Sequence, residues 1–173
     1  MLAQEKIDTI PQVADCISAD QFRETMRSLA GCVTVISTEN DGELFGFTAT
    51  AVCSVCAEPA TLLIAVNRTA RTHAHIARKS AFAVNILAED QSEVAAHFSR
   101  KADNQFADIE HRITPLGIPV LADVAAHLDC VVDQIYDVGT HSVFIGRVVD
   151  SGSSERSPLM YHDAKYSHLT ALS

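Results

Sequence analysis

The chain has 173 residues, 47% of them hydrophobic and 20% charged, a composition that predicts one folded domain and excludes a disordered or proline-rich protein. Its formal net charge of −9 argues against a nucleic acid or an anionic membrane surface as a partner. The odd number of cysteines, five, does not suit a small secreted disulfide framework, and no apolar run reaches the ~18 residues that a membrane helix needs.

The N-terminal region predicts an arm followed by a helix. Residues 1–17 show no persistent period and carry charges that break any signal-peptide hydrophobic region, so we expect a loosely packed arm and a cytoplasmic protein. Residues 18–173 are expected to form one domain. Its first element is a helix over residues 19–30, capped by Ser18 or Asp20, with one apolar face made of Phe22, Met26 and Leu29.

Strands joined by short turns dominate the rest of the chain. An Asp-Gly pair within residues 39–42 predicts a hairpin turn. Two short helices are expected, one at 73–79 with Thr72 as its cap and one at about 90–99, and the region 101–126 is expected to be irregular. Because strands and helices do not alternate regularly, we predict a mainly β fold, a small closed or half-open antiparallel barrel with peripheral helices. Its strands are predicted at residues 33–37, 46–55, 61–66, 81–87, 127–137, 141–150 and 159–169.

The strand predicted at 46–55 is the most informative segment. Alternate side chains of a strand share a face. One face suits a core, and the other carries three hydroxyls among four side chains, which suits a flat ligand edged by amide and carbonyl groups, such as a flavin ring. A solvent-facing strand is the alternative, since threonine favours strands in any case. The core face would be Phe47, Ala49, Ala51, Cys53 and Val55, and the ligand face Thr48, Thr50, Val52 and Ser54.

Metal binding is not predicted. Cys53 and Cys56 have the spacing of a zinc or redox pair, but no second pair exists, and residues three apart on a strand point to opposite faces. We interpret Cys53 as a small core residue. His73 and His75 are two apart, so on a helix their side chains diverge by roughly 200°.

Two other positions suit ligand binding. Arg68, Arg71 and Thr72 lie between a predicted strand and a predicted helix start, where backbone N–H groups and guanidinium groups can bind a phosphate. Two solvated loop arginines are the alternative. His141 follows Gly139 and Thr140 at the junction of two strands, where an exposed imidazole can stack on or hydrogen-bond a planar ligand, although an inert edge histidine is the simpler interpretation.

Three segments together resemble one family. Residues 46–55, 82–87 and 138–141 (GFTATAVCSV, FAVNIL and VGTH) are similar to the short-chain flavin reductases, the small reductase components of two-component flavin monooxygenases, including the reductase of 4-hydroxyphenylacetate 3-monooxygenase. The resemblance covers roughly residues 20–170. The corner of that family is often Gly-Asp-His, whereas this chain has Thr140 in place of the acid.

The resemblance implies a split β-barrel homodimer that binds FMN or FAD and takes hydride from NADH or NADPH. By position, His141 is implied as the catalytic residue, at the nicotinamide. The implied flavin-binding residues are Thr48, Ala49, Thr50 and Ala51 at the ring, Ser54, Asn67, Arg68, Arg71 and Thr72 along the ribityl-phosphate side, and Asn85, Ser99 and Arg100. Asn85 has an alternative role, a hydrogen bond to backbone only.

The expected function is that of an NAD(P)H:flavin oxidoreductase that supplies reduced flavin to a separate oxygenase. Such chemistry needs no protein nucleophile, because the cofactors hold the reactive atoms. The alternative is a non-catalytic flavin- or haem-binding split-barrel protein that serves as a store or sensor. Only His141 favours the enzyme over the store or sensor, because it could contact a second ligand, the nicotinamide nucleotide.

Overall fold

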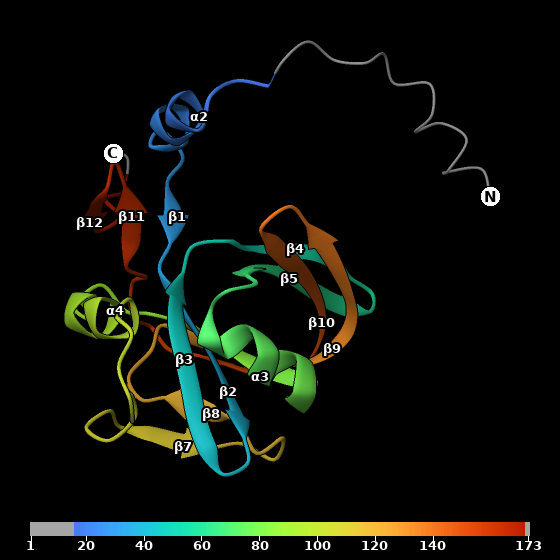
Figure 1. Cartoon of the computed structure of the whole chain (residues 1–173). Coiled ribbons are helices and arrows are strands. Elements are labelled where there is room, and N and C mark those ends of the chain that lie inside the picture. The colour runs from blue at the N-terminus through green and yellow to red at the C-terminus, as the bar shows by residue number, and fades with distance from the viewer. Residues whose placement is uncertain (1–15, 172–173) are drawn as a thin grey trace.

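The computed structural model describes residues 16–171, so all but the last two residues of the predicted N-terminal arm lie outside the described part (Figure 1). The helices are α2 (Ala19–Met26), α3 (Arg71–Lys79) and α4 (Ser92–Phe98). The strands are β1 (Gly31–Cys32), β2 (Thr34–Asn40), β3 (Glu43–Ala49), β4 (Val52–Ala57), β5 (Ala60–Asn67), β6 (Ala81–Ile86), β7 (His111–Ile113), β8 (Pro119–Leu121), β9 (Ala126–Val138), β10 (His141–Ser153), β11 (Met160–His162) and β12 (Lys165–Ser167). Within the described residues, no helix combines the length and the apolar character needed to cross a membrane.

Seven strands form one antiparallel sheet that curls on itself. Their order is β3-β2-β6-β9-β10-β5-β4, and each neighbouring pair runs antiparallel. The two edge strands, β3 and β4, are consecutive in the chain and are separated only by Thr50 and Ala51. The sheet must therefore bend round to bring its own edges together, which gives the half-open barrel that the sequence predicts (Figure 1).

The barrel interior is filled by large apolar side chains from facing strands. Ile36, Ile64, Phe82 and Phe144 are at most 1% exposed and belong to one cluster, which Ile76 of α3 joins from outside the sheet. Gly146 of β10 is required here, because a Cβ atom would lie 2.6 Å from Cζ of the buried Phe82. A second cluster, around Phe98 and Phe106, packs α4 against the sheet.

The strand predicted at 46–55 is in fact two strands, β3 and β4, with a corner at Thr50 and Ala51. The corner inverts the alternation of faces. Before it, Phe47 and Ala49 pack against the barrel cluster, as predicted, whereas after it Val52, placed opposite the buried Ile64, does so. The prediction that Ala51, Cys53 and Val55 face the core is therefore wrong, since all three are exposed.

The cysteine pair is also arranged differently from the prediction. A register shift between Ser54 and Cys56 places Cys53 opposite Leu63 and Cys56 opposite Thr61. Leu63 and Thr61 are two residues apart and share a face of β5, so the bulge brings both cysteines to one face of β4. Both are exposed free thiols.

Local signals elsewhere are mostly confirmed. The hairpin turn has Asp41 and Gly42 at φ of 55° and 82°, the left-handed region that an Asp-Gly pair tolerates. Ser18 caps α2 by accepting a hydrogen bond from the backbone N–H of Gln21 at 3.2 Å. Helix α3 begins earlier than predicted, with Ala70 as its N-cap, so Thr72 is a buried residue of its first turn and not its cap.

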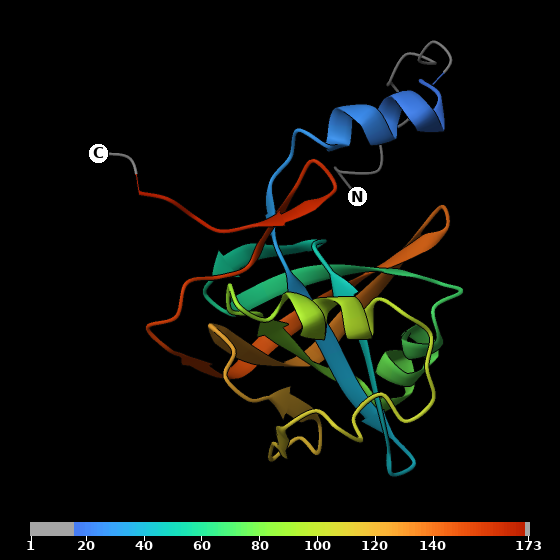
Figure 2. The ribbon, with the colours of Figure 1, turned by 90° about the vertical axis from the view of Figure 1, so that its left-hand side faces the viewer.

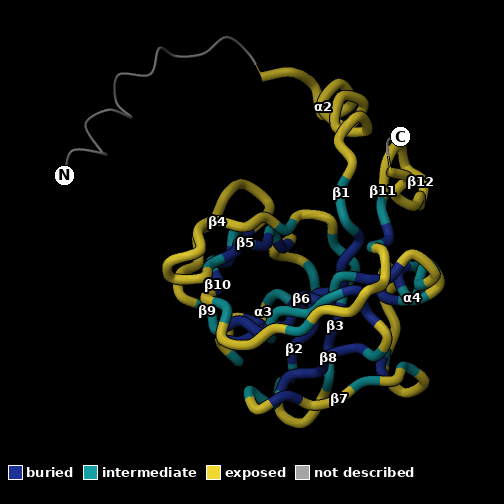
Figure 3. Tube along the Cα trace, turned by 180° about the vertical axis from the view of Figure 1, so that it is seen from behind, coloured by how far each residue is buried: buried dark blue, intermediate teal, exposed yellow. Residues whose placement is uncertain are grey.

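The regions expected to be least regular contain short hairpins. Strands β7 and β8 pair within the segment predicted to be irregular, and the last predicted strand, 159–169, is the hairpin β11–β12, which pairs with β1. In Figures 1 and 2, β11, β12 and α2 lie on one side of the barrel and outside it. Figure 3 shows α2 and β12 exposed, whereas β8 and much of β2 and β6 are buried.

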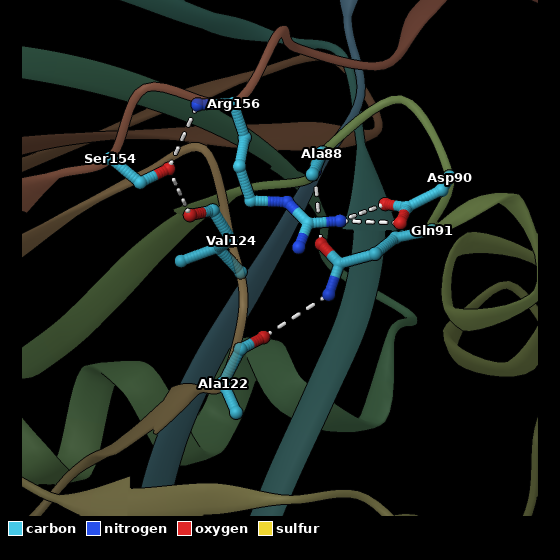
Figure 4. A network of polar contacts seen from close by, with 7 residues as sticks. All are labelled: Ala88, Asp90, Gln91, Ala122, Val124, Ser154 and Arg156. Atoms are coloured by element: carbon cyan, nitrogen blue, oxygen red, sulfur yellow. Dashed lines mark hydrogen bonds and ion pairs between the residues drawn. The ribbon is translucent and has the colours of Figure 1, made fainter.

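A polar network fastens the chain that leads into α4 (Figure 4). The side chain of Gln91 accepts a hydrogen bond from the backbone N–H of Ala88 at 2.9 Å and donates to the carbonyl of Ala122 at 3.1 Å. The guanidinium of Arg156 binds both oxygens of Asp90. These contacts tie the segment between β6 and α4 to the chain around Ala122 and Arg156.

Candidate functional site

Two hollows on the barrel surface share one lining residue, Ser99, and we call the two together the groove. The first is the β3 hollow, a space of about 320 Å³, and the second is the α3 hollow, a space of about 530 Å³. The β3 hollow is lined by Val33, Thr48, Ala49, Thr50, Ser99, Tyr161 and Tyr166. The α3 hollow is lined by Gly46, Phe47, residues 69–72, residues 98–103 and Gln105.

The β3 hollow suits a flat aromatic ligand. Its floor is the end of β3, where Ala49 lets a ring approach the backbone closely. Its far side is aromatic, because Tyr161 and Tyr166 pair across β11 and β12 with ring centroids 5.6 Å apart. Both tyrosines are partly exposed, at 38% and 40%, so their ring faces are available to stack.

The two threonines of this hollow have different roles. The hydroxyl of Thr48 donates to the carbonyl of Ala95 in α4 at 2.6 Å, so it ties the floor of the hollow to the helix and keeps only acceptor capacity for a ligand. Thr50 is exposed at the corner, and its hydroxyl is directed to no protein partner among the described residues. Thr50 is therefore the hydroxyl of the predicted stripe that can serve a ligand best.

The α3 hollow suits an anion. Arg71, Arg100 and Lys101 line it together with Thr69 and Thr72. The first turn of α3 adds backbone N–H groups that have no acceptor within the helix. The lining of this hollow thus carries three cations and one carboxylate, that of Asp103, in a chain whose net charge is −9.

The three cations differ in what holds them. Arg71 bridges Glu43 at 3.5 Å and Asp103 at 3.0 Å, and its guanidinium lies 4.9 Å from the centroid of the Phe45 ring. Among residues 16–171, neither Arg100 nor Lys101 makes an ion pair within 4.0 Å. An anion in the hollow would meet those two cations first.

Arg68 does not join this hollow, contrary to the expectation that it and Arg71 act together. Its guanidinium Nη1 lies 3.4 Å from a carboxylate oxygen of Asp137, at the far end of β9, and its backbone N–H donates to the carbonyl of Thr140 at 3.0 Å. The loop between β5 and α3 thus carries Arg68 toward the β9–β10 turn, whereas Arg71, the first residue of α3, lines the groove.

His141 lies at that turn. It is exposed, pairs with Asn67 of β5 in the sheet, and follows Gly139, whose φ of +57° forms the tight corner. Its Nδ1 atom is 2.9 Å from the hydroxyl of Thr140. The threonine that replaces the family's acid therefore contacts the imidazole directly.

Besides Arg68, four of the residues proposed for the flavin lie outside the groove. Asn85 is fully buried: its amide donates to the carbonyl of Val35 and the hydroxyl of Ser37, both at 2.9 Å, and accepts from the N–H of Leu121 at 2.8 Å. Its partners are two backbone groups and one side chain, so Asn85 is a structural amide in this fold and its flavin role has no support from the structure. The others are Ala51 and Ser54, which are exposed beyond the corner, and Asn67, whose side chain accepts hydrogen bonds from Thr69.

Several lining residues were not predicted from the sequence, among them Thr69, Lys101, Tyr161 and Tyr166. Thr69 and Lys101 each stand beside a predicted residue, so the same loop signal could have included them. Tyr161 and Tyr166 lie more than 100 residues from Thr48 in the chain, and only the fold brings them to it.

Comparison with known proteins identifies the group to which these features belong. The profile of the family described as "Flavin reductase like domain" matches residues 26–170. The chain is 37% identical over 156 residues to the FMN reductase (NADH) RutF of Pseudomonas syringae, covering 88% of each. It is 34% identical over 154 residues to HsaB, the reductase subunit of a flavin-dependent monooxygenase of Rhodococcus jostii, covering 88% of this chain and 79% of HsaB.

A solved structure of similar fold carries both kinds of nucleotide. The NADH:FAD oxidoreductase SgcE6 of Streptomyces globisporus, in complex with NAD and FAD fragments, superposes with a TM-score of 0.84 at 26% identity. The match covers 91% of this chain and 98% of that one. The barrel described above is accordingly the split barrel that the resemblance implies.

Proposed function

We propose that this chain, which belongs to the flavin reductase like domain family, is an NAD(P)H-dependent flavin reductase. In this proposal it supplies reduced flavin to a separate monooxygenase. The observation that carries the proposal is the pairing of the two hollows at Ser99, a flat aromatic-walled space joined to a cationic one. A flavin nucleotide has the same two parts, a planar ring system and a phosphate-bearing tail.

The lining residues fit such a nucleotide in chemistry as well as in layout. Ala49, Tyr161 and Tyr166 would hold the ring, and Thr50 would serve its polar edge. Arg100 and Lys101 would hold the phosphate, with Arg71 behind them. When bound, the flavin and the nicotinamide supply the hydride chemistry themselves, so the chain's task is to bind and orient the two rings.

The decisive experiment mixes purified protein with NADH and FMN and follows nicotinamide absorbance. We expect NADH to disappear over many turnovers only when both the protein and the flavin are present. Protein that binds FMN but never consumes NADH would be the store or sensor of the alternative hypothesis, and the reductase proposal would then be wrong. The same assay with NADPH and with FAD establishes the preference for each nucleotide.

The functional unit in this proposal is a homodimer. Helix α2 has no buried residue, and its apolar face is exposed, with Phe22 at 55%, Met26 at 42% and the nearby Leu29 at 65%. A helix of eight residues is too short to be stable by itself in water. A second copy of the chain, packed on this face, would bury it.

Sedimentation tests the dimer. We expect the wild type to sediment at twice 18.7 kDa at micromolar concentration. The double variant Phe22→Glu with Met26→Glu should shift the protein to monomer, since two charges would have to be buried in the interface. Ile113→Glu, at a residue of β7 with similar exposure (54%), is the matched control and should stay dimeric. A monomeric wild type would disprove this part of the proposal.

The proposed location is the cytoplasm. All five cysteines lie within the described residues and all are free thiols, which is the usual state in a reducing compartment.

A further inference from the structure

The turn that carries His141 has little packing of its own. The last residues of β9 are exposed, including Ile135 at 43%, Tyr136 at 54% and Val138 at 61%. In Figures 1 and 2 the end of the β9–β10 hairpin, drawn in orange, projects from the barrel. A histidine at such a tip would sample many positions unless other contacts hold the turn.

A chain of hydrogen bonds runs from the core to this turn. His73 of α3 packs edge-on against the buried Phe144, with ring centroids 5.2 Å apart. Its Nε2 lies 2.8 Å from the hydroxyl of Ser142, which is fully buried beside His141. The hydroxyl of Ser142 donates to Oδ1 of Asp137 at 2.6 Å, and Arg68 reaches Oδ2 of the same carboxylate at 3.4 Å.

The direction of each hydrogen bond is determined by chemistry. The hydrogen bond from Ser142, followed by the charge of Arg68, holds the pKa of Asp137 below its ordinary value, so this group is a carboxylate at neutral pH and only accepts. Ser142 gives its single proton to that carboxylate. His73 must therefore carry its proton on Nε2 and donate it to Ser142.

The hydrogen-bonded residues lie on both strands that flank the turn. Asp137 and Ser142 lie in β9 and β10 on either side of the corner and face each other in the sheet. Arg68 holds the corner a second time, through its backbone N–H to the carbonyl of Thr140, the residue whose hydroxyl contacts His141. Residues from two stretches of the chain, 68–73 and 137–142, thus hold the turn together, and Thr140 links the turn to the imidazole.

We propose that His73, Ser142, Asp137 and Arg68 form a positioning network that holds His141 where it meets the nicotinamide nucleotide. The inference rests on the proposed function and on the nicotinamide contact that the family resemblance implies for His141. None of the four lines the groove, so the network acts on the nicotinamide side of the reaction and not on flavin binding.

The test compares Asp137→Ala and Ser142→Ala with the wild type. We expect each variant to raise KM for NADH about fivefold, while kcat at saturating NADH and the Kd for FMN change by less than about twofold. Asp137→Asn, which keeps the oxygen that accepts from Ser142, should recover part of the loss. A merely structural role would lower kcat through loss of folded protein and leave KM unchanged. Asp90→Ala, which breaks the distant pair with Arg156 (Figure 4), is the matched control and should leave KM for NADH unchanged.

A double-mutant cycle decides whether the network acts through His141. In the His141→Ala background, Asp137→Ala should raise KM for NADH no further, because the side chain being positioned is gone. A full additional increase would overturn the proposal, as would wild-type KM in both single variants. A wild type that fails to oxidise NADH with flavin would instead overturn the proposed function and the network role with it, so the two failures are distinguishable.

Discussion

Replacing Arg100 and Lys101 together by alanine is expected to weaken FMN binding on the order of 100-fold. A charge-assisted hydrogen bond to phosphate contributes about 1.5 kcal/mol or more, and two such contacts at the lower limit sum to about 3 kcal/mol. Both side chains line the α3 hollow, and neither makes an ion pair within the described residues, so no internal partner competes with the phosphate. Titration of protein with FMN, followed by flavin fluorescence, measures the change.

Two controls separate phosphate binding from general damage. Riboflavin lacks the phosphate, so its affinity should be nearly the same in the double variant and in the wild type. Arg68→Ala removes an arginine of the same region that points to Asp137 instead of the hollow, and FMN affinity should be retained. Equal losses for FMN and riboflavin would show that Arg100 and Lys101 act through folding, and the α3 hollow would not be the phosphate site.

The sequence predicts the fold well where a local signal sufficed. The Asp-Gly turn, the Ser18 cap and the long strands β9 and β10 each depend on residues a few positions apart. The corner at Thr50 and Ala51 has no such signal, because both residues are compatible with a continuous strand. The break between β3 and β4 is determined by closure of the sheet. These two strands are the edges of the sheet, and the chain must pass directly from one edge to the other. The inverted faces of β4 and the exposure of Cys53 follow from it.

The site was predicted in part for the same reason. Three predicted residues that line the groove came from different signals: Thr50 from the stripe of hydroxyls, Arg71 from its place before a predicted helix, and Arg100 from the family resemblance. Arg68 was grouped with Arg71 by sequence proximity alone, but Asp137, 69 residues away, holds it elsewhere. Asn85 was assigned to the flavin through the family resemblance, and one of its three partners, the N–H of Leu121, lies 36 residues away. Long-range polar pairing of this kind leaves no periodic trace in a sequence.

Replacing His141 by alanine is expected to lower kcat/KM for NADH about tenfold, equivalent to about 1.4 kcal/mol, with the effect mainly in KM. Reacting atoms must approach to about 3–3.5 Å, so a ring that loses one of its contacts spends less time in a productive position. The imidazole is not needed as an acid or base, because a hydride carries no proton with it, and kcat should therefore stay within about threefold of the wild type at saturating NADH. FMN affinity should not change, since His141 lies outside the groove.

Steady-state kinetics with NADH varied at saturating FMN measure the effect, and His162→Ala, at an exposed histidine of β11, is the matched control. Wild-type kinetics in His141→Ala would remove this residue from the nicotinamide site and leave the β9–β10 turn without a role in the reaction.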